Sequence, residues 1–510
     1  MRLSPVLMGL ALSSAGIAAA GPWQDEVTQA SQRNFPEFLE LLAHDNVAAS
    51  AANIQRNAAL VEELLRKRGF RTQQLTNPAD RPAVFAELPR RTAGAKTVLL
   101  YIHMDGQPVI AAQWAQKDPF EPVVKERNAA GEWQEVSRDR LQAQPFDPEL
   151  RVFARSASDD KAPIAMLLTA VDLLVAKKQQ PAVNVKVIID GEEEISSPSL
   201  AGMMQAYAAL VAADALVILD GPAHASGRPT LAFGNRGIAQ ARLTVYGPRA
   251  PLHSGHFGNY APNPAFRLAR LLASMKGDDG RVLVKGYYDG IVLTTADREV
   301  LARAGNEEEA FRQRIGVAHA EAVGASYWES LQYPSLNIRG MASAAVGERV
   351  ANIVPSEAVA ELDMRTVPEA DGRHLFELAR AHIEGQGYHL VNGAPTEADR
   401  AQYDKLATFE LGDVQAAERQ PIDSPVGRWA MAALRSKTSP TPGADPVVIR
   451  MMGGTVPTDV LVDALHLPFV LVPTVNADNN QHAHDENLRI GVFVSGTEII
   501  YSLLTTPWPR

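Results

Sequence analysis

Apolar runs alternate with amphipathic segments along the first part of the chain. Three runs are predominantly apolar and rich in β-branched residues, which indicates strands buried on both faces: 97–102, 183–189 and 215–219. Segments 51–68 and 161–178 carry apolar residues at helical spacing, and Ser197-Pro198 predicts the N-cap and first turn of a further helix. Strands that alternate with helices predict a mostly parallel sheet.

The pattern changes in the middle of the chain. Apolar and polar residues alternate at 238–245 and 359–367, which is typical of half-exposed antiparallel strands. Asn263-Pro264 predicts the start of an amphipathic helix, and parallel-sheet character returns near Ile422. We therefore predict an α/β protein with a mostly parallel-sheet domain and an inserted α+β domain, with these boundaries: 21–237 and 421–510 for the first, 238–420 for the second.

The N-terminus has the form of a secretory signal. Arg2 precedes the apolar stretch 6–17, and three alanines at 18–20 form a cleavage site. We expect residues 1–20 to be a signal peptide and the protein to be exported, either periplasmic or secreted; an uncleaved anchor is the alternative. The chain has no Cys, which fits an oxidising compartment and leaves His and carboxylates as the available metal ligands.

Charge and composition exclude two classes of partner. Of the 510 residues, 46% are hydrophobic and 21% are charged, as in a soluble globular protein, and the formal net charge is −10. A negative surface argues against binding to nucleic acid or to an anionic membrane. A solvated acidic surface explains the charge without a partner of either class.

Histidines and carboxylates follow the predicted strands. His103 and Asp105 come directly after 97–102, a glutamate triplet at 192–194 follows the second strand, and Asp220 ends the third. Asp159 precedes a predicted helix, and His482 follows a strand near 468–472. Each has an ordinary explanation alone, such as a helix cap, a turn or a polar loop. Because carboxyl ends of parallel strands meet at one edge of a sheet, their combination predicts a two-metal site.

The ordered set of motifs resembles a known family. HMD at 103–105 is followed by SDDK, GEEE, LDG, LHSG and, at 482–487, HAHDEN. This series resembles the dizinc metallopeptidases that include carnosinases, aminoacylases and glutamate carboxypeptidases, from about residue 30 to the end of the chain. An aspartate at position 220 resembles the dipeptidases in particular. The resemblance implies a catalytic domain with an inserted lid and dimerisation domain.

The resemblance also implies residue roles. Asp159 would bridge two Zn²⁺ ions, with Mn²⁺ or Co²⁺ as substitutes; one ion would be completed by His103 and Asp220, the other by Glu194 and His482. Asp105 would orient His103, and Glu193 would be the general base that takes a proton from a metal-bridging water to give the attacking hydroxide. The peptide bond after Asp159 would be cis.

The inserted domain carries further family marks. His253 in the LHSG motif would reach the active site of a partner subunit and stabilise the oxyanion, which implies a homodimer. Arg365 would bind the substrate carboxylate, and Gly454 and Thr455 belong to a glycine-rich substrate loop, with Asn337 a weaker candidate. The expected activity is hydrolysis of the amide bond of dipeptides or short peptides with a free C-terminal carboxylate.

Several alternatives stay open. An N-acyl or N-carbamoyl amino-acid amidohydrolase would use the same residues, and a catalytically silent binding protein or a single-metal structural site would keep the fold. His484 could replace His482 as the ligand, whereas His224 and His256 are interpreted either as residues that support the ligands without binding metal or as structural residues. Glu192 is interpreted as a solvated neighbour of the catalytic pair, and the pair Met451-Met452 as a sign of a more apolar substrate pocket. Segment 107–150 is long for a loop and predicts a hairpin or a segment packed near the active site.

Overall fold

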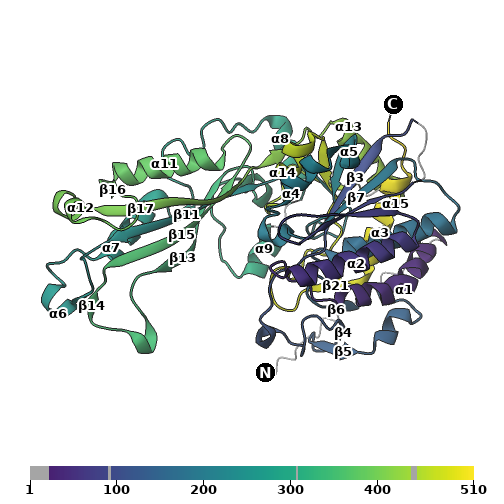
Figure 1. The fold of residues 1–510 in the computed structure, drawn as a ribbon, viewed down its shortest axis with the longest axis horizontal. Coiled ribbons are helices and arrows are strands. Elements are labelled where there is room, and N and C mark those ends of the chain that lie inside the picture. Colours follow the sequence, from purple (N-terminus) through teal and green to yellow (C-terminus); the bar gives the residue numbers. More distant parts are fainter. Residues whose placement is uncertain (1–21, 90–93, 306–307, 438–444, 510) are drawn as a thin grey trace, which may run out of the picture.

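A computed structural model describes residues 22–89, 94–305, 308–437 and 445–509 (Figure 1). The predicted signal peptide at residues 1–20 lies outside the described residues, so it stays a prediction. Among the helices in these ranges, none combines the length and the apolar character that a membrane crossing requires.

A mixed eight-stranded sheet forms the centre of the larger body (Figure 1). Its four central strands, in the order β7-β3-β8-β20, are mutually parallel, whereas β1 and β2 add an antiparallel edge, and β9 pairs antiparallel with β20 and parallel with β19. The prediction of a mostly parallel sheet is confirmed. In spatial order the strands are β1 (Arg71–Leu75), β2 (Ala83–Glu87), β7 (Asn184–Asp190), β3 (Thr97–His103), β8 (Ala215–Ile218), β20 (Phe469–Leu471), β9 (Thr230–Ala232) and β19 (Val447–Ile449).

Alternate side chains of β3 enter two different cores. Leu100 and its neighbours two residues away pack with one helix layer: α1 (Pro22–Leu42), α2 (Ala51–Lys67), α3 (Lys161–Ala176), α13 (Pro425–Lys437) and α15 (Ile490–Thr505). Leu99 and Tyr101 pack with the other: α4 (Leu200–Ala206), α5 (Ala208–Val211) and α14 (Thr458–Leu465). The helix predicted to open at Ser197-Pro198 begins later, because Ser199 is its N-cap, and it is divided into α4 and α5.

A smaller antiparallel sheet determines where two distant loops meet. It consists of β21 (Asn487–Arg489), β6 (Arg151–Phe153), β4 (Val123–Arg127) and β5 (Trp133–Val136), in that order. Strands β4 and β5 form the hairpin predicted within 107–150. Because Asn487 pairs with Phe153, the residues just before β21 lie beside those just after β6. The HAHDEN motif is thereby placed against the SDDK motif.

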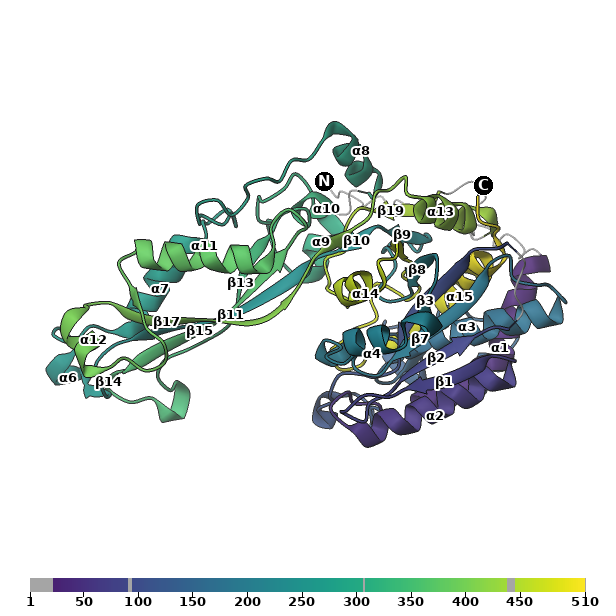
Figure 2. The same ribbon diagram turned by 45° about the horizontal axis from the view of Figure 1, so that its top comes forward.

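A second large sheet projects from the side of this body (Figures 1 and 2). Its order is β13 (Ser335–Ala342), β15 (Glu357–Thr366), β11 (Gly237–Tyr246), β17 (Leu406–Gln415) and β16 (His389–Leu390). The alternation predicted at 359–367 is present, because Ala360, Leu362 and Met364 are buried against α7 (Pro264–Met275) and α11 (Gly372–Gly385). The boundaries at 238 and 420 stay a prediction.

Short elements complete the projecting part. Strands β10 (Gly234–Asn235) and β18 (Glu418–Arg419) pair where the chain passes between the two sheets. The helices α8 (Thr295–Arg303), α9 (Glu308–Ile315) and α10 (Tyr327–Ser330) precede β13. At the end of the second sheet that lies far from the main body, Figure 1 shows α6 (Ser254–Phe257) and β14 (Ile353–Val354), with β12 (Leu252–His253) paired to β14 and α12 (Glu397–Gln402) nearby.

Candidate metal centre

The carboxyl ends of three adjacent parallel strands bring the first part of the site together. His103 is the last residue of β3 and pairs with Asp190, the last residue of β7. A short 3₁₀ turn that contains Glu193 and Glu194 follows β7, and Asp220 follows β8. Since the strand order is β7-β3-β8, these side chains converge on one edge of the sheet.

All five predicted ligands lie in one cluster, with Asp159 at its centre. Asp159 Oδ1 is 2.9 Å from His103 Nε2, and Asp159 Oδ2 is 3.1 Å from His482 Nε2. His482 Nε2 is also 3.2 Å from Glu194 Oε2. The two oxygens of Asp159 therefore face two different imidazoles, which is the arrangement a bridging carboxylate requires.

The donor atoms fall into two groups suited to cations. Asp159, Glu194 and His482 form one group, and His103, Asp160 and Asp220 form the other; within each group the candidate ligand atoms lie within 4.8 Å of one another. Sequence reasoning did not assign Asp160. Its Oδ1 is buried and has no hydrogen-bond partner among the described residues, so this oxygen is available to a cation. The peptide bond between Asp159 and Asp160 is cis, as the resemblance implied.

The cluster is a concentration of negative charge removed from water. Burial, together with the charge of Asp159, raises the pKa of Asp220 to about 6 and that of Glu194 to about 8. A hydrogen bond to Asp159 raises the pKa of His482 to about 9. Carboxylates that resist ionisation in this way are stabilised by a cation, and the His and carboxylate set suits Zn²⁺, Mn²⁺ or Co²⁺. The residues therefore fit a metal centre.

Asp105 connects the two halves of the site. His103 Nδ1 lies 3.2 Å from the Asp105 backbone carbonyl oxygen and 3.3 Å from Asp105 Oδ1, and the two carboxylate oxygens accept the backbone N–H groups of Glu193 at 3.2 Å and Glu194 at 2.9 Å. The Asp105 side chain is fully buried. One carboxylate thus orients an imidazole and also holds the turn that presents both glutamates.

Glu192 corrects a sequence interpretation. It was expected to be solvated, but its side chain is fully buried. One carboxylate oxygen lies 2.8 Å from Arg81 Nε, and the other accepts the backbone N–H of Ser199 at 3.0 Å. The expectation is wrong because an ion pair and the N-terminus of α4 offset the cost of burial. Glu192 therefore fixes the start of the 3₁₀ turn that contains Glu193 and Glu194.

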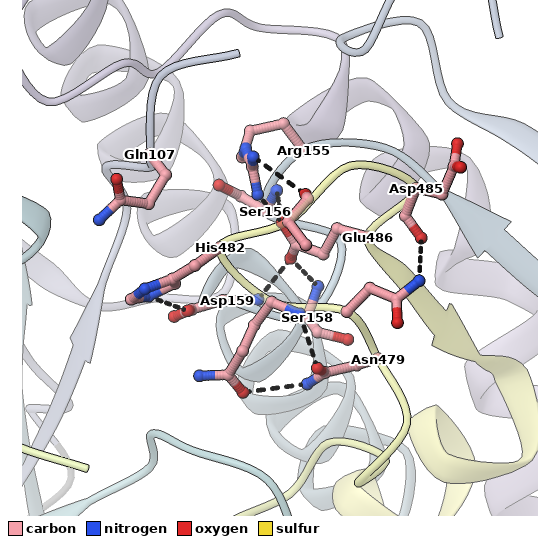
Figure 3. A network of polar contacts seen from close by, with 12 residues as sticks. Gln107, Arg155, Ser156, Ser158, Asp159, Asn479, His482, Asp485 and Glu486 are labelled. Atoms are coloured by element: carbon pink, nitrogen blue, oxygen red, sulfur yellow. Dashed lines mark hydrogen bonds and ion pairs between the residues drawn. The ribbon is translucent and has the colours of Figure 1, made fainter. Parts of the chain in front are cut away.

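Glu486 is a buried carboxylate that sequence reasoning passed over (Figure 3). Its Oε2 accepts hydrogen bonds from Arg155 Nη1 at 2.7 Å and from the Ser156 backbone at 2.9 Å. Its Oε1 accepts the backbone N–H groups of Ser158 and Asp159, both at 2.9 Å. Four donors from the Asp159 loop thus converge on one side chain, located four residues after His482. The signal available in the sequence was its place as the last residue but one of the HAHDEN motif.

A cavity of about 820 Å³ opens above the cluster, and residues from both large sheets line it. Glu193, Gly454 and Thr455 line it, and Arg365 of β15 donates a hydrogen bond from Nη1 to Thr455 Oγ1 at 2.8 Å. Arg236, which sequence reasoning did not select, also lines the cavity. Most of the predicted substrate residues are therefore brought together with the predicted metal ligands.

Two predicted residues lie elsewhere in the chain. Asn337 is exposed on β13 and does not line the cavity, so within one chain the structure does not bring it to the substrate. His253 is exposed in β12, beside α6, at the far end of the second sheet (Figure 1). Within one chain it does not reach the cavity either. A role for His253 in this site therefore requires a second subunit.

The remaining histidines are also placed. His484 is exposed and belongs to neither group of candidate ligands, so the geometry favours His482. His224 is buried and stacks on Trp328, with ring centroids 5.6 Å apart. His256 lies against His253, with ring centroids 4.8 Å apart.

Known proteins resemble this chain over most of its length. The sequence model described as peptidase family M20/M25/M40 matches residues 99–506. The Cys-Gly metallodipeptidase DUG1 of Saccharomyces cerevisiae is 25% identical over 80% of this chain and 79% of that protein. The Beta-Ala-His dipeptidase of Homo sapiens is 24% identical over 82% of this chain and 76% of that protein.

Solved structures show the same fold. The M20 family metallo-carboxypeptidase Sso-CP2 from Sulfolobus solfataricus superposes with a TM-score of 0.74 at 25% identity, covering 92% of this chain and 98% of that one. Human carnosine dipeptidase 1 superposes with a TM-score of 0.71 at 22% identity, covering 94% and 98%. These matches confirm the predicted fold class.

Removal of metal is expected to make the stability of the fold depend on pH. The folded pKa of Glu194 is about 8 against an ordinary 4.5, and that of Asp220 is about 6 against 3.8. The folded protein therefore holds protons that the unfolded chain releases. Their contribution to the free energy of unfolding is complete below the ordinary pKa values and is lost as pH rises toward about 8. Thermal unfolding in chelator should shift to lower temperature from about pH 5 to about pH 8.

The metal-loaded protein is the control for this experiment. Because cations favour the ionised carboxylates, its unfolding temperature should fall less over the same range. A chelated protein whose unfolding temperature is constant or rises across this range would contradict the assignment of these carboxylates to a metal centre.

Glu486→Gln should weaken metal binding by about tenfold to a hundredfold, the usual effect of losing a group that orients a ligand. The variant keeps the size of the side chain but replaces one acceptor oxygen with a donor that faces backbone N–H groups. Competition with a chromophoric chelator measures the affinity. Glu135→Gln, at an exposed position on β5, is the matched control and should bind metal as the unmodified protein does. Equal affinities in the two variants would rule out the positioning role.

Proposed function

The chain belongs to peptidase family M20/M25/M40 and is a metal-dependent peptidase, and from this premise we propose that it hydrolyses dipeptides or short peptides with a free C-terminal carboxylate. The observation that carries the proposal is that residues of the candidate metal centre and Arg365 line one cavity. Two relatives are named for the dipeptides Cys-Gly and Beta-Ala-His, which supports a dipeptide as the substrate.

We assign two cations to each chain, with Zn²⁺ first and Mn²⁺ or Co²⁺ as substitutes. Asp159 would contact both, with His103 and Asp220 on one side and Glu194 and His482 on the other. Cations held there would lower the pKa of water and polarise the carbonyl group of the scissile amide. Asp105 fixes the orientation of His103, and Glu486 fixes the loop that carries Asp159.

Glu193 is the proposed general base. Its carboxylate lines the cavity beside Asp159 and Glu194, and its backbone is held by Asp105. Burial raises its pKa well above the ordinary value, which moves it toward the range in which a carboxylate can both accept and return a proton. Glu193 would take a proton from the attacking water and transfer it to the leaving amine nitrogen.

Arg365 would anchor the substrate by its terminal carboxylate. A guanidinium group binds a carboxylate through two parallel hydrogen bonds, and the bond from Arg365 to Thr455 restricts the side chain to one orientation. Anchoring one end of the substrate positions its amide bond over the metal cluster, which reduces the entropic cost of reaching the transition state.

The proposal includes a homodimer and an exported location. His253 lies too far along the second sheet to serve the cavity of its own chain, which is what supports assigning it to the site of a partner. There it would stabilise the oxyanion. The periplasmic or secreted location rests on the form of residues 1–20 alone.

A substrate panel tests the proposed activity. Free dipeptides should be hydrolysed with a kcat/KM at least tenfold above that for single amino acids blocked by an N-acetyl or N-carbamoyl group. Glu193→Gln is the control, since it should lose turnover while it retains bound metal. Turnover of the blocked amino acids alone would replace the dipeptidase assignment with that of an amidohydrolase.

Complementation tests the shared site. His253→Ala should lower kcat by about a hundredfold or more, because removal of one oxyanion donor has that effect. This variant and Glu193→Gln are then unfolded and refolded together. About half of the dimers should be hybrids, and each hybrid has one intact site of two, so about a quarter of the unmodified activity should return. A mixture no more active than its two parents would contradict a histidine supplied by the partner.

A further inference from the structure

We propose that this enzyme selects dipeptides whose C-terminal residue carries an apolar side chain, a specificity that rests on the proposed dipeptidase function. The selecting surface is an apolar wall of the cavity formed by five side chains: Phe311, Tyr327, Trp328, Leu331 and Met452.

The apolar wall lies next to the metal cluster. Gly221 directly follows Asp220, and a methyl group on Gly221 would lie 2.9 Å from the Cε atom of Met452. Gly453 directly follows Met452, and a methyl group on Gly453 would lie 3.4 Å from Leu331 Cδ2 and 3.9 Å from Tyr327 Oη. The wall therefore extends from the edge of the metal site to the helices α9 and α10.

The same wall lies next to the carboxylate anchor. Met452 and Gly453 are followed by Gly454 and Thr455, and Thr455 Oγ1 accepts the hydrogen bond from Arg365. A residue whose carboxylate is bound by Arg365 is therefore held beside the loop that carries Met452. Its side chain is the part of the substrate that can lie against the apolar wall.

The wall is assembled before substrate arrives. The ring centroids of Phe311 and Tyr327 are 4.7 Å apart, and those of Tyr327 and Trp328 are 5.0 Å apart. Trp328 in turn stacks on the buried ring of His224. Rings that support one another in this way lose little conformational entropy on binding. The wall is also partly open to solvent, because Tyr327 is 39% exposed. An apolar substrate side chain that packs on Tyr327 would remove this apolar surface from water.

Arg314 offers the competing interpretation. It lines the same cavity, and a free guanidinium group there would favour an acidic side chain. Its guanidinium carbon, however, lies 5.1 Å from the ring centroid of Phe311, where it extends the wall by a cation–π contact. We therefore assign Arg314 to the support of Phe311, and an acidic substrate becomes a measurable alternative.

The test compares three dipeptides that differ only in the C-terminal side chain: Ala-Phe, Ala-Leu and Ala-Gly. Burial of one large apolar side chain is worth about tenfold to a hundredfold, so kcat/KM for Ala-Phe and Ala-Leu should exceed that for Ala-Gly by at least about tenfold. Ala-Glu should be as poor as Ala-Gly. Equal rates for Ala-Gly and Ala-Phe, or a preference for Ala-Glu, would overturn the proposal.

Variants locate the preference. Phe311→Ala and Met452→Ala should each reduce the ratio of kcat/KM for Ala-Phe over Ala-Gly by about tenfold, whereas Phe311→Leu should retain most of it. Phe266→Ala, which removes a ring that is 69% exposed outside the cavity, is the matched control and should leave the ratio unchanged. An unchanged ratio in folded Phe311→Ala and Met452→Ala would refute the assignment of the wall.

A binding measurement needs no variant. Free phenylalanine, as a product of Ala-Phe hydrolysis, should inhibit the unmodified enzyme with a Ki at least about tenfold below that of glycine. Similar Ki values would contradict the apolar wall. If no free dipeptide is hydrolysed at all, the proposed function fails; if dipeptides are hydrolysed without preference, only the specificity fails.

Discussion

The site depends on holding several carboxylates together away from water. Asp159, Asp160, Glu194 and Asp220 converge on the edge of one sheet, and their burial raises the pKa of most of them. Like charges at this distance cannot all ionise unless a cation offsets them. A fold that maintains such a cluster therefore favours the metal-bound state, and metal affinity and fold stability become linked.

Hydrogen bonds from the surrounding loops stabilise this arrangement. Asp105 holds the turn of the two glutamates, Arg81 pairs with Glu192 behind that turn, and Glu486 gathers the backbone of the Asp159 loop. The β6–β21 pairing brings the loop that carries Glu486 to the loop that carries Asp159, although the two are more than three hundred residues apart in the sequence. His103, Glu194 and Asp159 are thus positioned by carboxylates that belong to neither group of candidate ligands.

Sequence reasoning predicted the fold and the residues of the candidate cluster because both leave a periodic or local signal. Apolar runs predicted β3, β7 and β8, and a histidine or carboxylate at the end of each pointed to one edge of the sheet. Burial of charged residues leaves no such signal, so Glu192 was expected in solvent and Glu486 received no role. Asn337 and Arg236 show the same limit, since only the three-dimensional structure tells which polar residue faces the cavity.

The central claim is that Asp159 joins two cations in each chain. Calorimetric titration of chelator-stripped protein with Zn²⁺ measures this directly, with Asp159→Ala compared under the same conditions. We expect about two ions per chain in the unmodified protein and weakened binding of both in the variant, as a shared ligand requires. One ion per chain in the unmodified protein, or an Asp159→Ala variant that keeps one site at full affinity, would contradict the account.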